Sequence, residues 1–191
     1  PFWDFFEPRL RDLFGPQLAG VSREDLLAAI NEVRPGPIRV DADEVTYNLH
    51  ILMRFEMERA LFEGRLAIAD LPREWNRLSE EIVGVTPEDD ARGVLQDIHW
   101  SGGAFGYFPS YALGNMIAAQ LWYRALDQLP GLENDFARGD FSRLLSWLRE
   151  NIHRRGKRLD TRELVVAVTG QPLGTGALLR HLAERYLPHA P

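Results

Sequence analysis

Four side chains that can do chemistry lie close together in one stretch, residues 93–111. They are Asp97, His99, Tyr107 and Tyr111, and four glycines lie between positions 93 and 106. Neither the period of a helix nor the alternation of a strand holds there. Because glycine lets a backbone approach a ligand closely while the aromatic residues anchor it, we interpret residues 93–111 as a functional loop.

His99 is a candidate for catalysis, and the two tyrosines are candidates for the same step. His99 lies beside Trp100 with Asp97 two residues before it, so its imidazole can be half-buried and oriented. The alternative is a core histidine that bonds a backbone carbonyl. Tyr107 and Tyr111 are four residues apart. A phenol is a neutral donor that suits a developing oxyanion, but tyrosines at this spacing also pack against each other.

Arg39 is the second candidate, and it follows a chain stop at Pro35-Gly36-Pro37. We expect residues 38–43 to be a short extended piece. The Arg39 guanidinium either forms a structural salt bridge with Asp41 or Asp43, or offers its planar fork to a carboxylate ligand. The residues alone leave both alternatives open.

No other motif with chemistry of its own is present. None of the five histidines pairs at the i, i+4 spacing with which helical histidines bind zinc, and the sequence has no cysteine. Dinucleotide, P-loop and nucleophile-elbow patterns are also absent. We interpret the basic run at 153–158 as a helix C-terminus, with a phosphate site as the alternative.

Most of the sequence outside residues 93–111 has apolar residues at the three- and four-residue spacing of helices, and these helices must position the candidate residues. We expect helices at about 2–14, 22–34, 44–63, 70–83, 111–129, 136–152, 161–168 and 177–186. On the third, Tyr47, His50 and Arg54 share a face, with Asp43 one turn behind. The predicted fold class is all-α with at most one short extended segment. Because no linker or repeat divides the chain, we expect residues 1–191 to form one helical unit.

Composition limits the class of partner. With 191 residues and 45% hydrophobic side chains, the chain can bury a core. The net charge of −6 and the dispersed basic residues disfavour nucleic acid or an anionic membrane as partner. We expect a cytoplasmic protein, because no membrane-spanning run, signal peptide or cysteine occurs. The aromatic start without an initiator Met leads us to expect that the chain was cut from something larger.

Two motifs resemble the carboxypeptidase Taq family of zinc metallocarboxypeptidases. The family's G-x-x-Q-D-x-H-W motif matches Gly93-Val94-Leu95-Gln96-Asp97-Ile98-His99-Trp100, and its I-R-x-x-A-D motif matches Ile38-Arg39-Val40-Asp41-Ala42-Asp43. The flanks at 44–50 and 105–109 are similar too. The resemblance extends over essentially the whole chain but not to the family's N-terminal portion, which carries H-E-x-x-H. It implies the C-terminal half of a larger helical metallopeptidase fold with a deep cleft.

The resemblance also implies a role for each candidate residue. Arg39 would recognise the C-terminal carboxylate of a peptide, and His99 with Tyr107 or Tyr111 would stabilise the tetrahedral oxyanion. The resemblance also implies that three polar residues of the same motifs hold these side chains in position without contacting substrate. They are Asp97, Gln96 and Asp43.

The absent H-E-x-x-H motif determines what the chain can do alone. In such enzymes zinc polarises the scissile carbonyl and the glutamate of that motif is the general base. We therefore expect zinc or another divalent metal in the complete enzyme, no metal ligand in this chain, and no activity from the chain by itself. The expected partners are peptide substrates, bound through their C-terminal carboxylate, the N-terminal half of the same protein, and a second copy in a homodimer. The alternative is a zinc-free helical interaction module derived from that fold.

Overall fold

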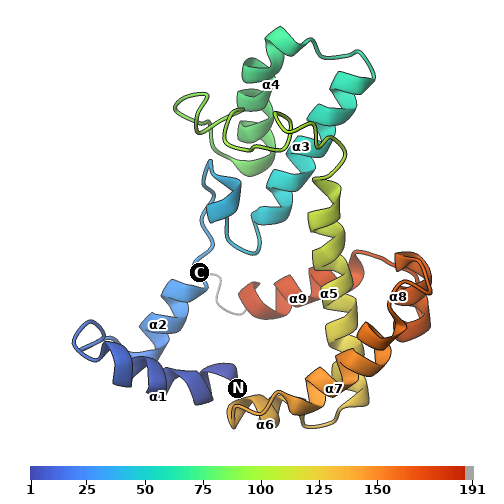
Figure 1. Ribbon diagram of the computed structural model, residues 1–191. Helices are drawn as coiled ribbons and strands as arrows, with labels where there is room; N and C mark the ends of the chain where they lie inside the picture. The colour runs from blue at the N-terminus through green and yellow to red at the C-terminus, as the bar shows by residue number, and fades with distance from the viewer. Residues whose placement is uncertain (188–191) are drawn as a thin grey trace. The chain divides into compact units, whose positions relative to one another are not determined.

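The computed structural model describes residues 1–187, and every regular element in that range is helical (Figure 1). The α-helices are α1 (Phe2–Phe14), α2 (Arg23–Ile30), α3 (Tyr47–Phe62), α4 (Leu71–Leu78), α5 (Pro109–Gln128), α6 (Leu132–Ala137), α7 (Ser142–Asn151), α8 (Thr161–Thr169) and α9 (Gly176–Tyr186). Short turns of other helix types are η1 (Arg39–Asp41), η2 (Ile68–Asp70), η3 (Ser79–Val83) and η4 (His153–Arg155). The all-α prediction is confirmed.

The extended piece expected at residues 38–43 is wrong at its centre. Ile38 and Ala42 have extended backbone dihedrals, but the three residues between them form the 3₁₀ turn η1. The backbone N–H groups of Asp41 and Ala42 donate to the carbonyls of Ile38 and Arg39 at 3.2 Å each. Pro37 restricts only the residue before it, so it does not prevent this turn.

Contacts group the chain into two compact units. Unit 1 comprises residues 1–27 and 116–184, and unit 2 comprises 28–115 together with the residues from 185 onward. All candidate site residues lie in unit 2. The expectation that residues 1–191 act as one helical unit stays a prediction.

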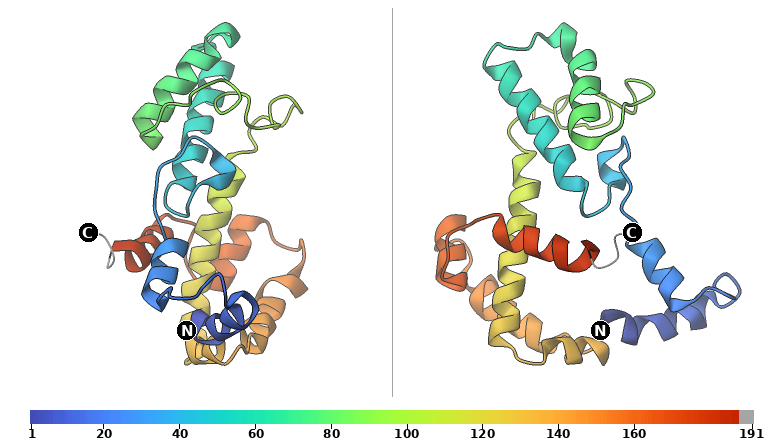
Figure 2. Two further views of the ribbon diagram at one scale, coloured as in Figure 1. Left: turned by 90° about the vertical axis from the view of Figure 1, so that its left-hand side faces the viewer. Right: turned by 180° about the vertical axis from the view of Figure 1, so that it is seen from behind.

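Unit 2 is built on α3 and α4, which lie side by side, with the long connection 84–108 running back across them (Figures 1 and 2). Its core consists of Met53, Met57, Trp75, Leu78 and Val83. The connection contributes Val85, Val94 and Trp100 to the same core. Burial of these three side chains holds a segment without regular structure against two helices.

Unit 1 has a core of its own where the second half of α5 packs with α6, α7 and α8. The core residues are Ala125, Leu132, Phe136, Trp147 and Val168. The helix α8 begins at a capping box in which Asp160 is the N-cap and Glu163 is its partner. No helix among residues 1–187 has both the length and the apolar composition needed to cross a membrane.

Candidate functional site

One face of α3 carries three buried polar side chains. His50, Arg54 and Glu58 follow one another at intervals of four, so they stand in a single row along the helix. We call them the α3 polar stripe. All three are buried, and Arg54 and Glu58 bond directly to the 93–111 segment. The helix therefore offers the segment a row of fixed polar groups.

The centre of the site is an ion triad in which Asp97 lies between Arg39 and Arg54. Arg39 donates from Nε (3.0 Å) and Nη2 (2.7 Å) to Asp97 Oδ1. Arg54 donates from Nε to Asp97 Oδ2 at 2.7 Å, and its Nη2 lies 2.7 Å from the same oxygen. Both oxygens of the carboxylate are thus held, each by a different guanidinium.

Burial and charge act in opposite directions on these groups. Burial would raise the pKa of Asp97, but the hydrogen bond from Arg39 and the charge of Arg54 lower it below its usual value. Burial lowers the pKa of Arg54 to about 10, against the attraction of Asp97. Burial, followed by the Arg54 cation, lowers the pKa of His50 to about 4. At neutral pH both arginines and Asp97 are therefore charged and His50 is neutral.

Arg39 forms its ion pair with a carboxylate that neither sequence alternative named. The salt bridge to Asp41 or Asp43 is not the one that forms, since its partner Asp97 lies 58 residues further along the chain. Arg39 also donates from Nη1 to the hydroxyl of Tyr47 at 3.1 Å, and it is only 7% exposed. A buried guanidinium pairs with whatever carboxylate the fold brings to it, and local spacing does not decide the choice.

Gln96 and Asp43 hold backbone rather than the guanidinium. Gln96 accepts from the Arg39 N–H at 2.9 Å and donates to the carbonyl of Pro37 at 2.9 Å. Asp43 accepts from the N–H groups of Val45 and Thr46, and so it orders the chain that enters α3. Both expected supporting residues lie in unit 2, but only Gln96 contacts Arg39.

His99 is brought together with Tyr111. Its Nε2 lies 3.1 Å from the Tyr111 hydroxyl, and its ring lies 4.3 Å from that of Phe108. The Nδ1 atom is 3.9 Å from Asp97 Oδ1, which is too far for a hydrogen bond. Tyr107 differs: its ring lies 5.8 Å from His99, and it is 51% exposed. Of the two tyrosines, Tyr111 is the one hydrogen-bonded to the histidine.

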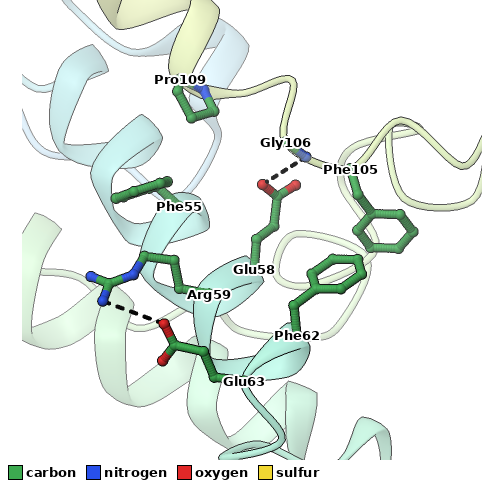
Figure 3. Close-up of a pocket in the computed structure, with 8 residues that line it drawn as sticks. All are labelled: Phe55, Glu58, Arg59, Phe62, Glu63, Phe105, Gly106 and Pro109. Atoms are coloured by element: carbon green, nitrogen blue, oxygen red, sulfur yellow. Dashed lines mark hydrogen bonds and ion pairs between the residues drawn. The ribbon is translucent and has the colours of Figure 1, made fainter.

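Glu58 anchors the loop that carries His99. Its carboxylate accepts from Trp100 Nε1 at 2.7 Å and from the Gly106 N–H at 3.1 Å, the second of which is drawn in Figure 3. Gly106 has φ +72°, a left-handed conformation that favours glycine. Phe62 and Phe105 stack edge to face beside it (Figure 3). One side chain of α3 thus fixes both ends of residues 100–106.

Two cavities border these groups. A cavity of about 250 Å³ is lined by Ala42, Asp43, Glu44, Tyr47, Tyr111 and Asn115, and so by the two tyrosines that bond Arg39 and His99. A larger one of about 460 Å³ lies between α3 and residues 105–109, and Glu58 is among the residues that line it (Figure 3). The smaller cavity therefore adjoins the candidate site.

Within residues 1–187, no group of three or more His, Asp or Glu side chains is arranged to hold a metal ion. These described residues therefore do not form a metal site by themselves.

Residues 1–186 match the profile of the carboxypeptidase Taq (M32) metallopeptidase family. The chain belongs to this family. It is 49% identical to thermostable carboxypeptidase 1 of Thermus thermophilus over 185 residues. This match covers 97% of the present chain and 36% of the relative. Against carboxypeptidase 1 of Bacillus subtilis the identity is 42%, with 97% and 37% covered.

Solved structures give the same answer. An M32 carboxypeptidase from Deinococcus radiodurans R1 superposes with a TM-score of 0.94 at 46% identity, covering 97% of this chain and 37% of that one. Metallocarboxypeptidase 1 of Trypanosoma cruzi superposes with a TM-score of 0.91 at 39% identity, covering 97% and 39%. The family expected from the sequence is confirmed. The chain spans somewhat more than a third of its relatives' length, where the sequence led us to expect a half.

Proposed function

We propose that this chain forms the substrate-binding and transition-state-stabilising part of a metal-dependent carboxypeptidase that removes C-terminal residues from peptides. The observation that carries the proposal is the buried ion triad next to the hydrogen-bonded pair of His99 and Tyr111. A peptide carboxylate requires a cation, and a developing oxyanion requires hydrogen-bond donors.

Arg39 holds the substrate's terminal carboxylate. A guanidinium has five N–H donors, and Asp97 and Tyr47 take three of those of Arg39, which leaves two for a ligand. The Tyr47 and Tyr111 rings lie 5.9 and 5.4 Å from its central carbon and restrict its orientation. A fixed fork decides which peptide bond is presented for cleavage, as an exopeptidase needs.

His99 and Tyr111 stabilise the oxyanion as one unit. When His99 Nε2 carries the proton, it donates to the Tyr111 oxygen, and the Tyr111 O–H is then available to the oxyanion. Tyr107 lies at the edge of this arrangement and contributes contact area.

The remaining parts of the machinery lie outside this chain. Zinc or another divalent ion, its ligands and the general base belong to the rest of the same protein, which is the first expected partner. A homodimer and a cytoplasmic location belong to the same proposal. The chain by itself is then inactive and binds no stoichiometric metal, and elemental analysis of the purified 191 residues that found one tight zinc would contradict this.

Peptides that differ only at the C-terminus test the carboxylate role in the complete protein. Wild type should cleave a peptide with a free carboxylate much faster than its C-terminal amide, because amidation removes the charge that Arg39 binds. Equal cleavage of the two peptides would show that no carboxylate anchor exists. Finding no H-E-x-x-H in the polypeptide upstream of Pro1 would favour the zinc-free interaction module instead.

A further inference from the structure

Arg54 is the least exposed charged residue of the described chain, at 0%. It stands in the middle of the α3 polar stripe, and its Nη1 donates to the carbonyl of His50 at 3.0 Å. Its guanidinium lies 4.5 Å from the Trp75 ring and 5.4 Å from that of Phe108. No solvent reaches it, so any effect it has on a ligand acts through its neighbours.

The ion triad does not balance its own charge. It contains two guanidinium groups and one carboxylate, so it carries one net positive charge. His50 adds none, because its pKa of about 4 leaves it neutral at pH 7. Glu58 is one turn away, but Trp100 and Gly106 occupy its carboxylate, and it forms no ion pair with Arg39 or Arg54 in the part of the chain described.

A pair of Arg39 and Asp97 alone would be neutral and would attract an anion weakly. We propose that Arg54 sets the anion affinity of the site: it binds one oxygen of Asp97, so the carboxylate is shared and Arg39 keeps positive charge for a substrate carboxylate. Arg54 is thus a positioning residue that never touches substrate. This inference rests on the proposed function.

Packing alone does not explain an arginine at this position. Burying a guanidinium is costly, and the lowered pKa of Arg54 reflects that cost. An apolar side chain of similar size would fill the space against Trp75 and Phe108 without it. The second cation leaves the ion triad with one excess positive charge, and a substrate carboxylate is an anion that can balance it.

The test uses the complete protein and four forms: wild type, Arg54→Met, Arg54→Lys, and Arg54→Met combined with Asp97→Asn. The readout is kcat and KM for a peptide with a free C-terminus and for its amide. A neighbouring charge changes the affinity of a site for an ion by about ten- to thousandfold. We therefore expect Arg54→Met to raise the KM of the free peptide at least about tenfold, with a smaller change in kcat.

The other two variants distinguish an effect of the Arg54 charge from an effect of the hydrogen bonds that Arg54 makes. Arg54→Lys keeps the cation, so the preference for the free peptide should stay within a few-fold of wild type. The double variant removes one positive and one negative group, which leaves Arg39 with its full charge. It should recover part of the preference that Arg54→Met loses. A purely supporting role of Arg54 predicts no recovery, because the double variant removes still more hydrogen bonds.

Each failure has its own signature. If Arg54→Met keeps the wild-type preference, or the double variant recovers none of it, the inference about Arg54 is overturned while the carboxylate anchor stands. If wild type itself does not distinguish the two peptides, the proposed function fails before any variant is made. If Arg54→Met does not fold, Asp97→Asn carries the test. It should make acetate a tighter competitive inhibitor, and unchanged or weaker inhibition overturns the inference.

Discussion

Removing His99 and the Tyr111 hydroxyl together should cost little more than removing either alone. His99 Nε2 and the Tyr111 oxygen are 3.1 Å apart, so each group orients the other. His99→Ala leaves the Tyr111 hydroxyl without the partner that directs it. Tyr111→Phe removes the hydroxyl and leaves the imidazole with nothing to polarise. If the two groups act on the oxyanion as a unit, each single change already disables it.

The size of the effect follows from that contact. Loss of one oxyanion donor costs about 3 kcal/mol, on the order of a hundredfold in kcat, with KM affected far less. Residues in direct contact couple by roughly 0.5 to 3 kcal/mol. We expect the upper part of this range for His99→Ala with Tyr111→Phe, so that the double variant retains nearly the kcat of the worse single variant.

Tyr107→Phe is the matched control. It also removes one hydroxyl near His99, but that tyrosine is half-exposed and contacts the imidazole only through its ring at 5.8 Å. Its effect should add to that of His99→Ala within about 0.5 kcal/mol. Steady-state kinetics of the complete protein measure all five forms besides wild type. Additive losses for His99 and Tyr111, or an unchanged kcat for His99→Ala, would return the histidine to a packing role.

Three further outcomes are expected. Arg39→Lys should lower kcat/KM of the complete protein about ten- to hundredfold, because an ammonium cannot replace the fork; an unchanged kcat/KM would refute the anchor. The same Arg39→Lys substitution should also lower Tm, because the buried Arg39 side chain bonds Asp97 and Tyr47. Glu58→Gln leaves Trp100 or Gly106 without an acceptor, so it should destabilise by about 1–3 kcal/mol and lower kcat, whereas exposed Glu63→Gln should do neither. The pKa of His50 is about 4 in the folded protein and about 6.5 in the unfolded chain, so the unfolded chain takes up a proton first as the pH falls. The free energy of unfolding should therefore fall between these two pH values, by about 3 kcal/mol at pH 4. Thermal unfolding of His50→Gln as a function of pH should lack this loss of stability.

The sequence led to the principal site residues because they lie in two short motifs. All three of Arg39, Asp97 and His99 are in unit 2, where Arg39 bonds the Asp97 carboxylate and His99 Nδ1 lies 3.9 Å from it. The pairing itself was not predictable. Arg39 and Asp97 are 58 residues apart, and only the path of the connection 84–108 over α3 brings them together.

Helical periodicity groups His50 and Arg54 on one face of α3, but it does not predict that this polar face is buried. On this helix the apolar Leu52 is 47% exposed, whereas the charged Arg54 is fully buried. A charged side chain in a helix ordinarily indicates a solvated face. Residues 93–111 decide which side of α3 becomes buried, because they supply the partners of its polar side chains. The spacing of residues within the helix carries no information about those partners. The one available signal was the i, i+4, i+8 spacing of His50, Arg54 and Glu58.

The α3 polar stripe explains how a loop rich in glycine can hold the side chain of His99 in a defined position. Gly103 and Gly106 adopt left-handed dihedrals, and each glycine loses more conformational freedom on folding than other residues. Such a loop cannot fix His99 by its own backbone preferences. Two buried side chains of a regular helix supply the restraint instead: Arg54 holds Asp97, and Glu58 holds Trp100 and Gly106 on either side of the turn. Positional accuracy at His99 is therefore a property of α3, so substitutions on its buried polar face should reduce turnover even where the fold survives.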